Sequence, residues 1–408
     1  MQRLSRLEPV SGTIKQDAHD FIVEEITESG VVLEAGKRYT NSDLNMESSP
    51  EGKFSVFVLQ KTNWNTSQAL REIARRLRRG IKSTAFAGTK DRTSVSTQLC
   101  SIYGVKSEEL ERVHIKDISV NGAWQSEKGV RMGDLLGNRF TISVRDVSDP
   151  QRIDDIAGEL RGAFPNYFGS QRFGFRDNNV QIGVAILAGD FERAVMDFLT
   201  NTNLETNGES IAARKRLADE RDFKAALDYF PRHLKYERLV IEHLSRIPTD
   251  FANAIRKLPR SLTLMFVHSV EAHIFNEELA TRVKQGKTGP GGVDIVCNPD
   301  NFGFPDLSTV HSFEPDSDKE SIPVARIVGY DTAELSNEEV ALLDSMGLTR
   351  ESFKVPSMPE LNAKGSYRAM LAPFRDFSHA HEAGISKLGF SLPAGSYATV
   401  LMEEFIKG

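Results

Sequence analysis

The sequence has little of several features that would point to whole classes of protein. Only two cysteines occur in 408 residues, Cys100 and Cys297, and they lack CxxC spacing, so we expect neither a disulfide framework nor a cysteine zinc site. The longest apolar runs, such as Val56 to Leu59, fall far short of the roughly 20 residues of a membrane span. The N-terminal MQRLSRLEPVSGTIK contains no signal-peptide core. These features predict a cytoplasmic protein without a membrane partner.

Common motifs for cofactors and nucleophiles are also missing from the sequence. It has no GxGxxG, and GKTGPGG, at Gly286 to Gly292, lacks the earlier glycine of a phosphate-binding loop. His379 and His381 could share one face of a strand, but no third ligand of a recognisable metal motif accompanies them. We therefore expect no cofactor and no metal.

The charge is unevenly distributed along the chain, although the overall balance is only −6. Nine basic and two acidic residues lie between Lys61 and Arg92, a net charge of +7, whereas the segment from His311 to Ser345 is strongly acidic. A local patch, rather than the total, decides what a surface attracts. The basic segment is typical of a phosphate-binding surface, although a solvated helix face would look the same.

The first part of the chain shows alternating strand and helix patterns. KFSVFVLQK, residues 53–61, predicts a mostly buried strand. In the helix that follows, Leu70, Ile73, Ala74 and Leu77 share one face, and Gly80 stands at the expected stop.

A strand and a helix are also expected further along this part. NRFTISVRDV, residues 138–147, alternates Phe140, Ile142 and Val144 with polar residues, as in a strand with one packed face. Asp149 and Pro150 then favour a helix start.

The middle of the chain differs from the first part in its sequence pattern, and this change predicts a separate domain. Helical periodicity dominates from about residue 175 to Glu278, and a Gly/Pro-rich loop and the acidic segment follow it. The last segment returns to a strand, a turn and a helix. We expect an α+β protein with a mixed, mainly antiparallel sheet flanked by helices. Residues 1–174 and 366–408 would form this catalytic domain, and residues 175–365 a large inserted, largely helical α/β domain.

The stretch FAGTKDRTSVSTQ, Phe86 to Gln98, is ambiguous by itself. Lys90 and Asp91 follow a glycine between two strand-like segments. An exposed turn needs no more than this, and a catalytic carboxylate held by a cation would have the same sequence.

Six motifs in order resolve this ambiguity by resemblance to a known family. They are GTIKQDAHDFIVEEI, KTNWNTSQALREIARRL, FAGTKDRTSVSTQ, GNRFTISVR, NYFGSQRFG and LPAGSYATVLMEEF. Together they resemble the TruD family of tRNA pseudouridine synthases over essentially the whole chain. The resemblance implies isomerisation of a uridine in tRNA to pseudouridine, usually at position 13, without a cofactor. We also expect a monomer. The resemblance also implies that the inserted domain forms the second wall of an RNA cleft.

The family's GxKD motif assigns the catalytic nucleophile to Asp91, with Lys15 as its cationic partner. A carboxylate can attack or support C1′ while the N1–C1′ bond breaks and the uracil rejoins through C5. Because the target base must leave its stack, aromatic residues are expected in a pocket for the flipped uridine. The resemblance gives these pocket residues as Phe21, Phe140 and Tyr397, although Phe21 and Phe140 could equally be packed strand residues. The side-chain amide of Asn138 could hydrogen-bond the uracil edge, and a turn asparagine would look the same.

Three further residues are candidates for contact with the RNA. Lys90 is adjacent to Asp91, but in an extended segment its side chain would point the other way, which favours a structural or phosphate contact. Gln98 and Arg172 complete this set. The glycines of NYFGSQRFG equally permit a structural joint between domains.

Two other functions share part of this pattern. A non-catalytic RNA-binding protein on the same fold would need the basic and aromatic residues, but not an ionised Asp91 or Lys15. A hydrolase of N-glycosidic bonds would need a second carboxylate, and none accompanies Asp91 in an obvious way.

Overall fold

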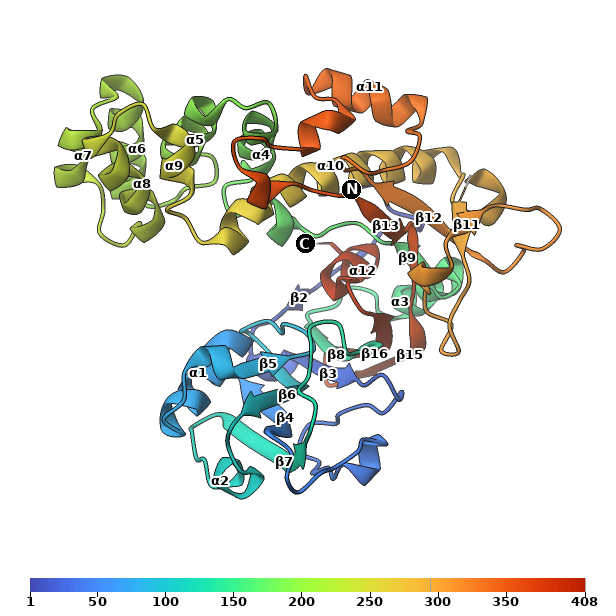
Figure 1. The fold of residues 1–408 in the computed structure, drawn as a ribbon. Coiled ribbons are helices and arrows are strands. Elements are labelled where there is room, and N and C mark those ends of the chain that lie inside the picture. The colour runs from blue at the N-terminus through green and yellow to red at the C-terminus, as the bar shows by residue number, and fades with distance from the viewer. Residues whose placement is uncertain (294, 408) are drawn as a thin grey trace. The chain divides into compact units, whose positions relative to one another are not determined.

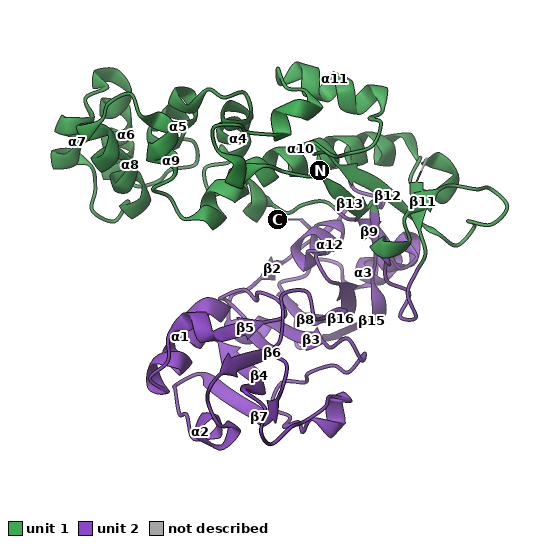
Figure 2. Ribbon diagram, in the orientation of Figure 1, with its two compact units in different colours: residues 1–2, 167–298, 307–370 green, residues 3–166, 299–306, 371–408 purple. Residues whose placement is uncertain are grey.

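The computed structural model describes residues 1–293 and 295–407 and divides the chain into two compact units (Figures 1 and 2). The sheet unit comprises residues 3–166, 299–306 and 371–408, and the helical unit residues 1–2, 167–298 and 307–370. This division assigns residues 167–174 and 366–370 to the helical unit and residues 299–306 to the sheet unit, whereas the sequence placed the boundaries at 174/175 and 365/366. The functional roles of the two domains stay predictions. No helix in the described ranges has the length and hydropathy to cross a lipid bilayer.

The sheet unit contains a nine-stranded sheet with the main order β15-β16-β8-β3-β6-β4-β7, in which β2 also pairs with β8 and β5 with β6. Only β3 and β6 run parallel within it. The expected α+β fold with a mainly antiparallel sheet is thereby confirmed. Its strands are β2 (Thr13–Ile14), β3 (Phe21–Ile26), β4 (Phe54–Thr62), β5 (Thr84–Phe86), β6 (Val95–Tyr103), β7 (Ile118–Ser126), β8 (Gly137–Arg145), β15 (Arg375–Glu382) and β16 (Ile385–Pro393).

Helices and short strands flank this sheet. The alternation expected for residues 138–147 is confirmed, since Phe140, Ile142 and Val144 of β8 are buried. The remaining elements of the sheet unit are β1 (Val10–Ser11), α1 (Thr66–Arg76), α2 (Ser107–Glu111), α3 (Pro150–Leu160), β9 (Ala163–Pro165), β14 (Leu371–Pro373), α12 (Ala398–Phe405) and β17 (Ile406–Lys407).

Helix α1 packs the face that its sequence predicts. Leu70, Ile73 and Ala74 are fully buried against residues of β4 and β6. The expected stop at Gly80 is wrong, because α1 ends at Arg76 with Leu77 as its C-cap. Gly80 instead precedes a short 3-10 turn. Helix α3 begins as expected, with Asp149 at its N-cap and Pro150 in the first turn.

The helical unit combines a helical core with a four-stranded sheet of order β11-β10-β12-β13. Figure 2 shows α4 to α11 in this unit. Its elements are α4 (Asn179–Leu187), α5 (Phe191–Thr200), α6 (Gly208–Glu220), α7 (Phe223–Tyr229), α8 (Lys235–Arg246), α9 (Phe251–Ile255), α10 (Arg260–Gln285), β10 (Ile295–Cys297), β11 (His311–Ser312), β12 (Ile322–Ile327), α11 (Asn337–Ser345) and β13 (Ser366–Ala369).

The close approach of α4 and α10 depends on Gly183. A Cβ atom at this position would overlap the carbonyl oxygen of Phe266 and lie 2.6 Å from Cγ2 of Val270. We expect Gly183→Ala to lower the free energy of unfolding by about 2 kcal/mol in urea titrations, since overpacking outweighs the gain in helix propensity. The control is Gly158→Ala in α3, where no atom lies within 4 Å of the new Cβ. An unchanged stability of Gly183→Ala would contradict this packing argument.

Candidate active site

The GTKD turn between β5 and β6 is anchored to the protein through its backbone. Nε2 of Gln98 donates a hydrogen bond to the carbonyl oxygen of Gly88 at 2.8 Å. The backbone N–H of Lys90 donates to Oγ1 of Thr66 at 3.0 Å, and that hydroxyl donates to Oε1 of Gln98 at 2.8 Å. Thr66 is the first residue of α1, so the start of this helix fixes the turn.

The carbonyl group of Asp91 accepts two further hydrogen bonds. Nζ of Lys61, at the end of β4, donates to it at 2.9 Å, and Oγ of Ser94 donates to it at 3.0 Å. The same ammonium group lies 3.5 Å from the carbonyl oxygen of Lys90. Both lone pairs of the Asp91 carbonyl therefore have donors.

A fully buried ion pair lies beside this turn. Nζ of Lys90 is 2.6 Å from Oε2 of Glu25 on β3, and the two side chains are only 3% and 0% exposed. Oε1 of Glu25 accepts the backbone N–H of Leu99 at 2.7 Å. Burial raises the pKa of the Glu25 carboxyl despite the neighbouring ammonium group. The side chain of Lys90 thus makes the structural contact that the sequence favoured as one of two alternatives.

The carboxylate of Asp91 is the part of the turn that is presented outward. Its side chain is 42% exposed, and Oδ2 lies 3.4 Å from Nζ of Lys15. The ammonium group of Lys15 also lies 4.1 Å from the ring centroid of Phe21. Lys15 has a φ of 60°, a conformation that is uncommon outside glycine and that occurs at functional sites. The structure therefore brings together the two residues expected to be catalytic.

Aromatic side chains form a row on three neighbouring strands of the sheet. The rings of Phe21 and Phe140 meet edge to face at 6.0 Å, and Phe140 stacks on Phe390 at 5.6 Å. Phe21 and Phe140 are both buried. Asn138, two residues before Phe140 on β8, has a buried Oδ1 atom with no hydrogen-bond partner in the described residues. An acceptor in this state is suited to a ligand that brings an N–H group.

The other candidates occupy different surroundings. Tyr397 is half-buried and directly precedes α12. Gln98 is fully buried and holds the turn through its amide. Arg172 belongs to the helical unit, where its guanidinium group lies 5.3 Å from the ring centroid of Phe168. Contacts of these residues with RNA, like those of Lys90, stay predictions.

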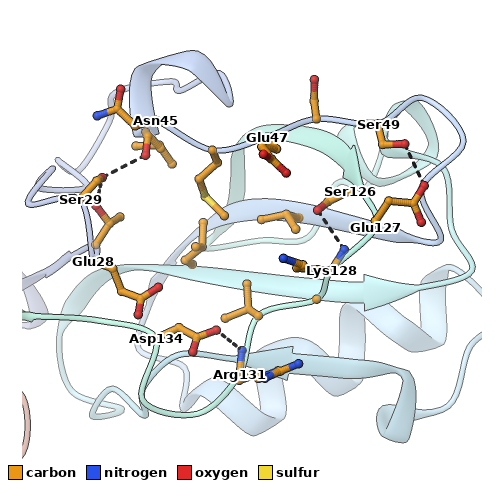
Figure 3. A pocket seen from close by; sticks show the side chains of 18 residues that line it. Glu28, Ser29, Asn45, Glu47, Ser49, Ser126, Glu127, Lys128, Arg131 and Asp134 are labelled. Carbon is orange, nitrogen blue, oxygen red and sulfur yellow. Dashed lines mark hydrogen bonds between the residues drawn. The ribbon is translucent and has the colours of Figure 1, made fainter. Parts of the chain in front are cut away.

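A separate cavity of about 480 Å³ lies on the face of the sheet opposite to that of Lys61 (Figure 3). Val56 and Leu99 line it, and because side chains alternate along a strand, they face away from Lys61. Acidic side chains outnumber basic ones on its rim, so it is poorly suited to phosphate. The charged lining residues are Glu28, Glu47, Glu127, Lys128, Arg131 and Asp134.

The two histidines of SHAHE bind protein groups. Nδ1 of His379 lies 3.1 Å from the carboxylate of Asp154, and Nδ1 of His381 lies 2.9 Å from Oγ of Ser386. No cluster of three or more possible metal ligands occurs in the described ranges.

Sequence analysis did not identify two charged residues of this site, Lys61 and Glu25. Lys61 follows the apolar run Val56 to Leu59, and Glu25 lies in the strand FIVEEI. The sequence did contain a signal for them, because each is a charged residue at a strand position where burial is expected. A buried charge needs a compensating partner. Lys61 and Lys90 were counted in the basic segment, but both are buried and add nothing to a surface patch.

A half-exposed carboxylate on an anchored turn, paired with a lysine that directly follows β2, is the arrangement that a catalytic site with a single acidic nucleophile requires. The model of the family tRNA pseudouridine synthase D (TruD) matches residues 2–405. A protein of Methanococcoides burtonii named "Probable tRNA pseudouridine synthase D" is 33% identical, over 98% of this chain and 93% of its own. One of Methanococcus maripaludis, named "Probable tRNA pseudouridine synthase D 2", is 35% identical, over 98% and 96%.

A solved structure agrees with these sequence relatives. The crystal structure of a Methanosarcina mazei protein with the name tRNA pseudouridine synthase D (TruD) has a TM-score of 0.79 and 31% identity, and it covers 100% of this chain and 96% of its own. The chain belongs to the TruD family. The resemblance drawn from the six motifs is therefore confirmed.

Proposed function

We propose that the protein converts a specific uridine of tRNA, at position 13, to pseudouridine, with Asp91 as the nucleophile. One observation carries the assignment to Asp91. The backbone and neighbours of the GTKD turn are anchored inward, and its carboxylate is presented outward 3.4 Å from Nζ of Lys15. The names of the relatives support tRNA as the substrate and isomerisation as the reaction.

The reaction needs a carboxylate at C1′ and a transferable proton at C5. The bond between N1 and C1′ breaks while the carboxylate of Asp91 attacks or supports C1′. The uracil leaves with the electron pair of that bond on N1, turns and joins C1′ through C5, and the carboxylate is released if an ester had formed. C5 then loses its proton to a base and N1 gains a proton, so the product is an isomer of the substrate. Lys15 holds the carboxylate in place by charge attraction and hydrogen bonding.

The aromatic row is proposed to receive the flipped base. Stacking of a base on an aromatic ring contributes about 1–3 kcal/mol, which offsets much of the unstacking cost. Phe21 and Phe140 would provide this contact, together with the ring of Tyr397. The unpartnered Oδ1 atom of Asn138 would accept the N3–H group of uracil.

The exposed basic face of α1 and the turn after it are proposed to bind RNA phosphates. Arg75 and Arg76 share one carboxylate, that of Glu72, so the face keeps an excess of positive charge. Binding through it should weaken steeply with salt. The helical unit is proposed as the second RNA-binding domain of a cytoplasmic, monomeric enzyme. The exposed basic residues are Arg71, Arg75, Arg76, Arg78, Arg79 and Lys82.

The test is incubation of the purified protein with unmodified tRNA transcripts and no additive, followed by carbodiimide labelling and primer extension. We expect one new stop at position 13 that is absent with Asp91→Ala. A stop elsewhere would correct the position only. Release of free uracil would indicate a hydrolase, and salt-sensitive binding without any stop would favour an RNA-binding protein.

A further inference from the structure

Lys61 is a buried lysine directly beneath the GTKD turn. It occupies the last part of β4, and it is 0% exposed. Its ammonium group bonds to backbone carbonyl oxygens, at 2.9 Å for Asp91 and 3.5 Å for Lys90. Among the described residues, no carboxylate oxygen lies within the 4.0 Å of an ion pair with it. Its charge is thus compensated by peptide dipoles alone at close range.

This arrangement is costly for a folded protein. An ammonium group loses its hydration on burial, and an unpaired one is rarely kept in a protein interior. The second cation nearby, Lys90, adds repulsion. Methionine has a similar length without the charge, and would fill the same space at lower cost. A charge retained under these conditions, next to the reacting group, is typical of a functional site.

We propose that Lys61 is a positioning residue for the reaction, and that its ammonium group fixes the peptide of Asp91 so that the carboxylate points at Lys15. The proposal rests on Asp91 being the nucleophile.

Lys61 acts with Ser94 on the same atom. The carbonyl oxygen of Asp91 accepts one bond from Lys61 and one from Ser94, at 2.9 and 3.0 Å. These two bonds approach from β4 and from the residue that directly precedes β6, and they prevent the peptide from rotating. A rotation of this peptide would move the carboxylate away from C1′, and misplacement by about 1 Å can cost roughly 10²-fold in rate.

The surroundings of Lys61 make this contact sensitive to pH. Burial, and next the charge of Lys90, lower the pKa of Lys61 to about 8, while the charge of Asp91 acts in the opposite direction. Burial raises the pKa of the Cys100 thiol well above its ordinary value, so this group stays neutral over the same range. As the pH rises through about 8, Lys61 loses its positive charge, and its hydrogen bond to the Asp91 carbonyl weakens.

The test compares Lys61→Met with Lys53→Met, an exposed lysine just before the same strand. We expect Lys61→Met to lower kcat about 10²-fold on tRNA, with KM within about threefold. The unaltered enzyme should also lose activity between about pH 7 and pH 9, and Lys61→Met should lack this change. Thermal unfolding should show that Lys61→Met is folded. Unchanged kcat, or a pH profile that keeps the same step in Lys61→Met, would overturn the proposal.

A second measurement does not depend on the substrate. Hydrogen exchange of the segment from Gly88 to Ser94 should be about tenfold or more faster in Lys61→Met than in Lys53→Met. Equal exchange in both variants would show that Lys61 does not hold the turn. If the unaltered protein forms no pseudouridine on tRNA, the proposed function fails, whereas the exchange result still decides whether Lys61 positions Asp91.

Discussion

Asp91→Asn is expected to lower kcat by at least about 10³-fold while tRNA binding stays within about threefold of the unaltered protein. Asparagine has nearly the same shape, and the backbone anchors of the turn from Lys61, Ser94 and Thr66 do not involve the carboxylate. The substitution therefore removes the proposed nucleophile without removing the turn. Single-turnover kinetics at saturating protein measure the chemical step, and filter binding measures the affinity.

The control is Asp155→Asn, an exposed aspartate on α3. It removes the same charge from the same unit and should leave both quantities unchanged. Asp91 would not be the nucleophile if Asp91→Asn kept more than about a tenth of the rate. A parallel loss of binding and rate would instead assign Asp91 to the structure of the turn.

The largest effect on stability is expected from Lys90→Met. This variant leaves the carboxylate of Glu25 buried without its ammonium partner at 2.6 Å, and breaking a buried pair on one side costs about 3–5 kcal/mol. The free energy of unfolding in urea should fall by this amount near neutral pH. The double variant Glu25→Gln/Lys90→Met keeps an acceptor for the N–H of Leu99 and should recover more than half of the loss.

The pH dependence of this loss has a defined sign. A carboxyl whose pKa is higher in the folded than in the unfolded protein destabilises the fold as the pH rises through that interval. Burial already raises the pKa of Glu25 in the presence of Lys90, and removal of Lys90 should raise it further. The deficit of Lys90→Met should therefore be smaller near pH 5 than near pH 8. A deficit that is equal at both values would mean that Glu25 keeps its charge by another contact.

The local elements could be predicted because each rests on periodicity or on a capping residue. Alternation along β8 placed Phe140 and Ile142 in the core, and the arrangement of Asp149 before Pro150 placed the start of α3. The end of α1 was wrong because Gly80 offered a plausible stop, whereas Arg78, with a φ of 55°, takes the left-handed conformation nearer the helix end. Local sequence does not show which residue adopts that conformation.

The candidate site likewise contains residues that the sequence could identify and residues that it could not. The family motifs placed Lys15 beside Asp91, and the structure brings the two together. The charges underneath, Lys61 and Glu25, could not be assigned, because their burial depends on which strands become neighbours. β3 and β6 pair in parallel from distant parts of the chain, with Glu24 opposite Thr97, and this pairing brings Glu25 to the backbone N–H of Leu99. No periodicity within either strand contains this information.

The pairing of β16 with β8 has a consequence for the order of synthesis. Nine residue pairs join Gly137–Arg145 to Ile385–Pro393, and residues 167–298 and 307–370 of the helical unit are translated between these strands. During synthesis on the ribosome, one edge of β8 stays unpaired until its partner strand emerges about 240 residues later. This takes some tens of seconds at ordinary elongation rates. An unpaired edge of this kind invites association with other nascent chains. Phe390 reaches Phe140 only after β16 has been synthesised, so the aromatic row that is proposed to receive the base forms late in synthesis.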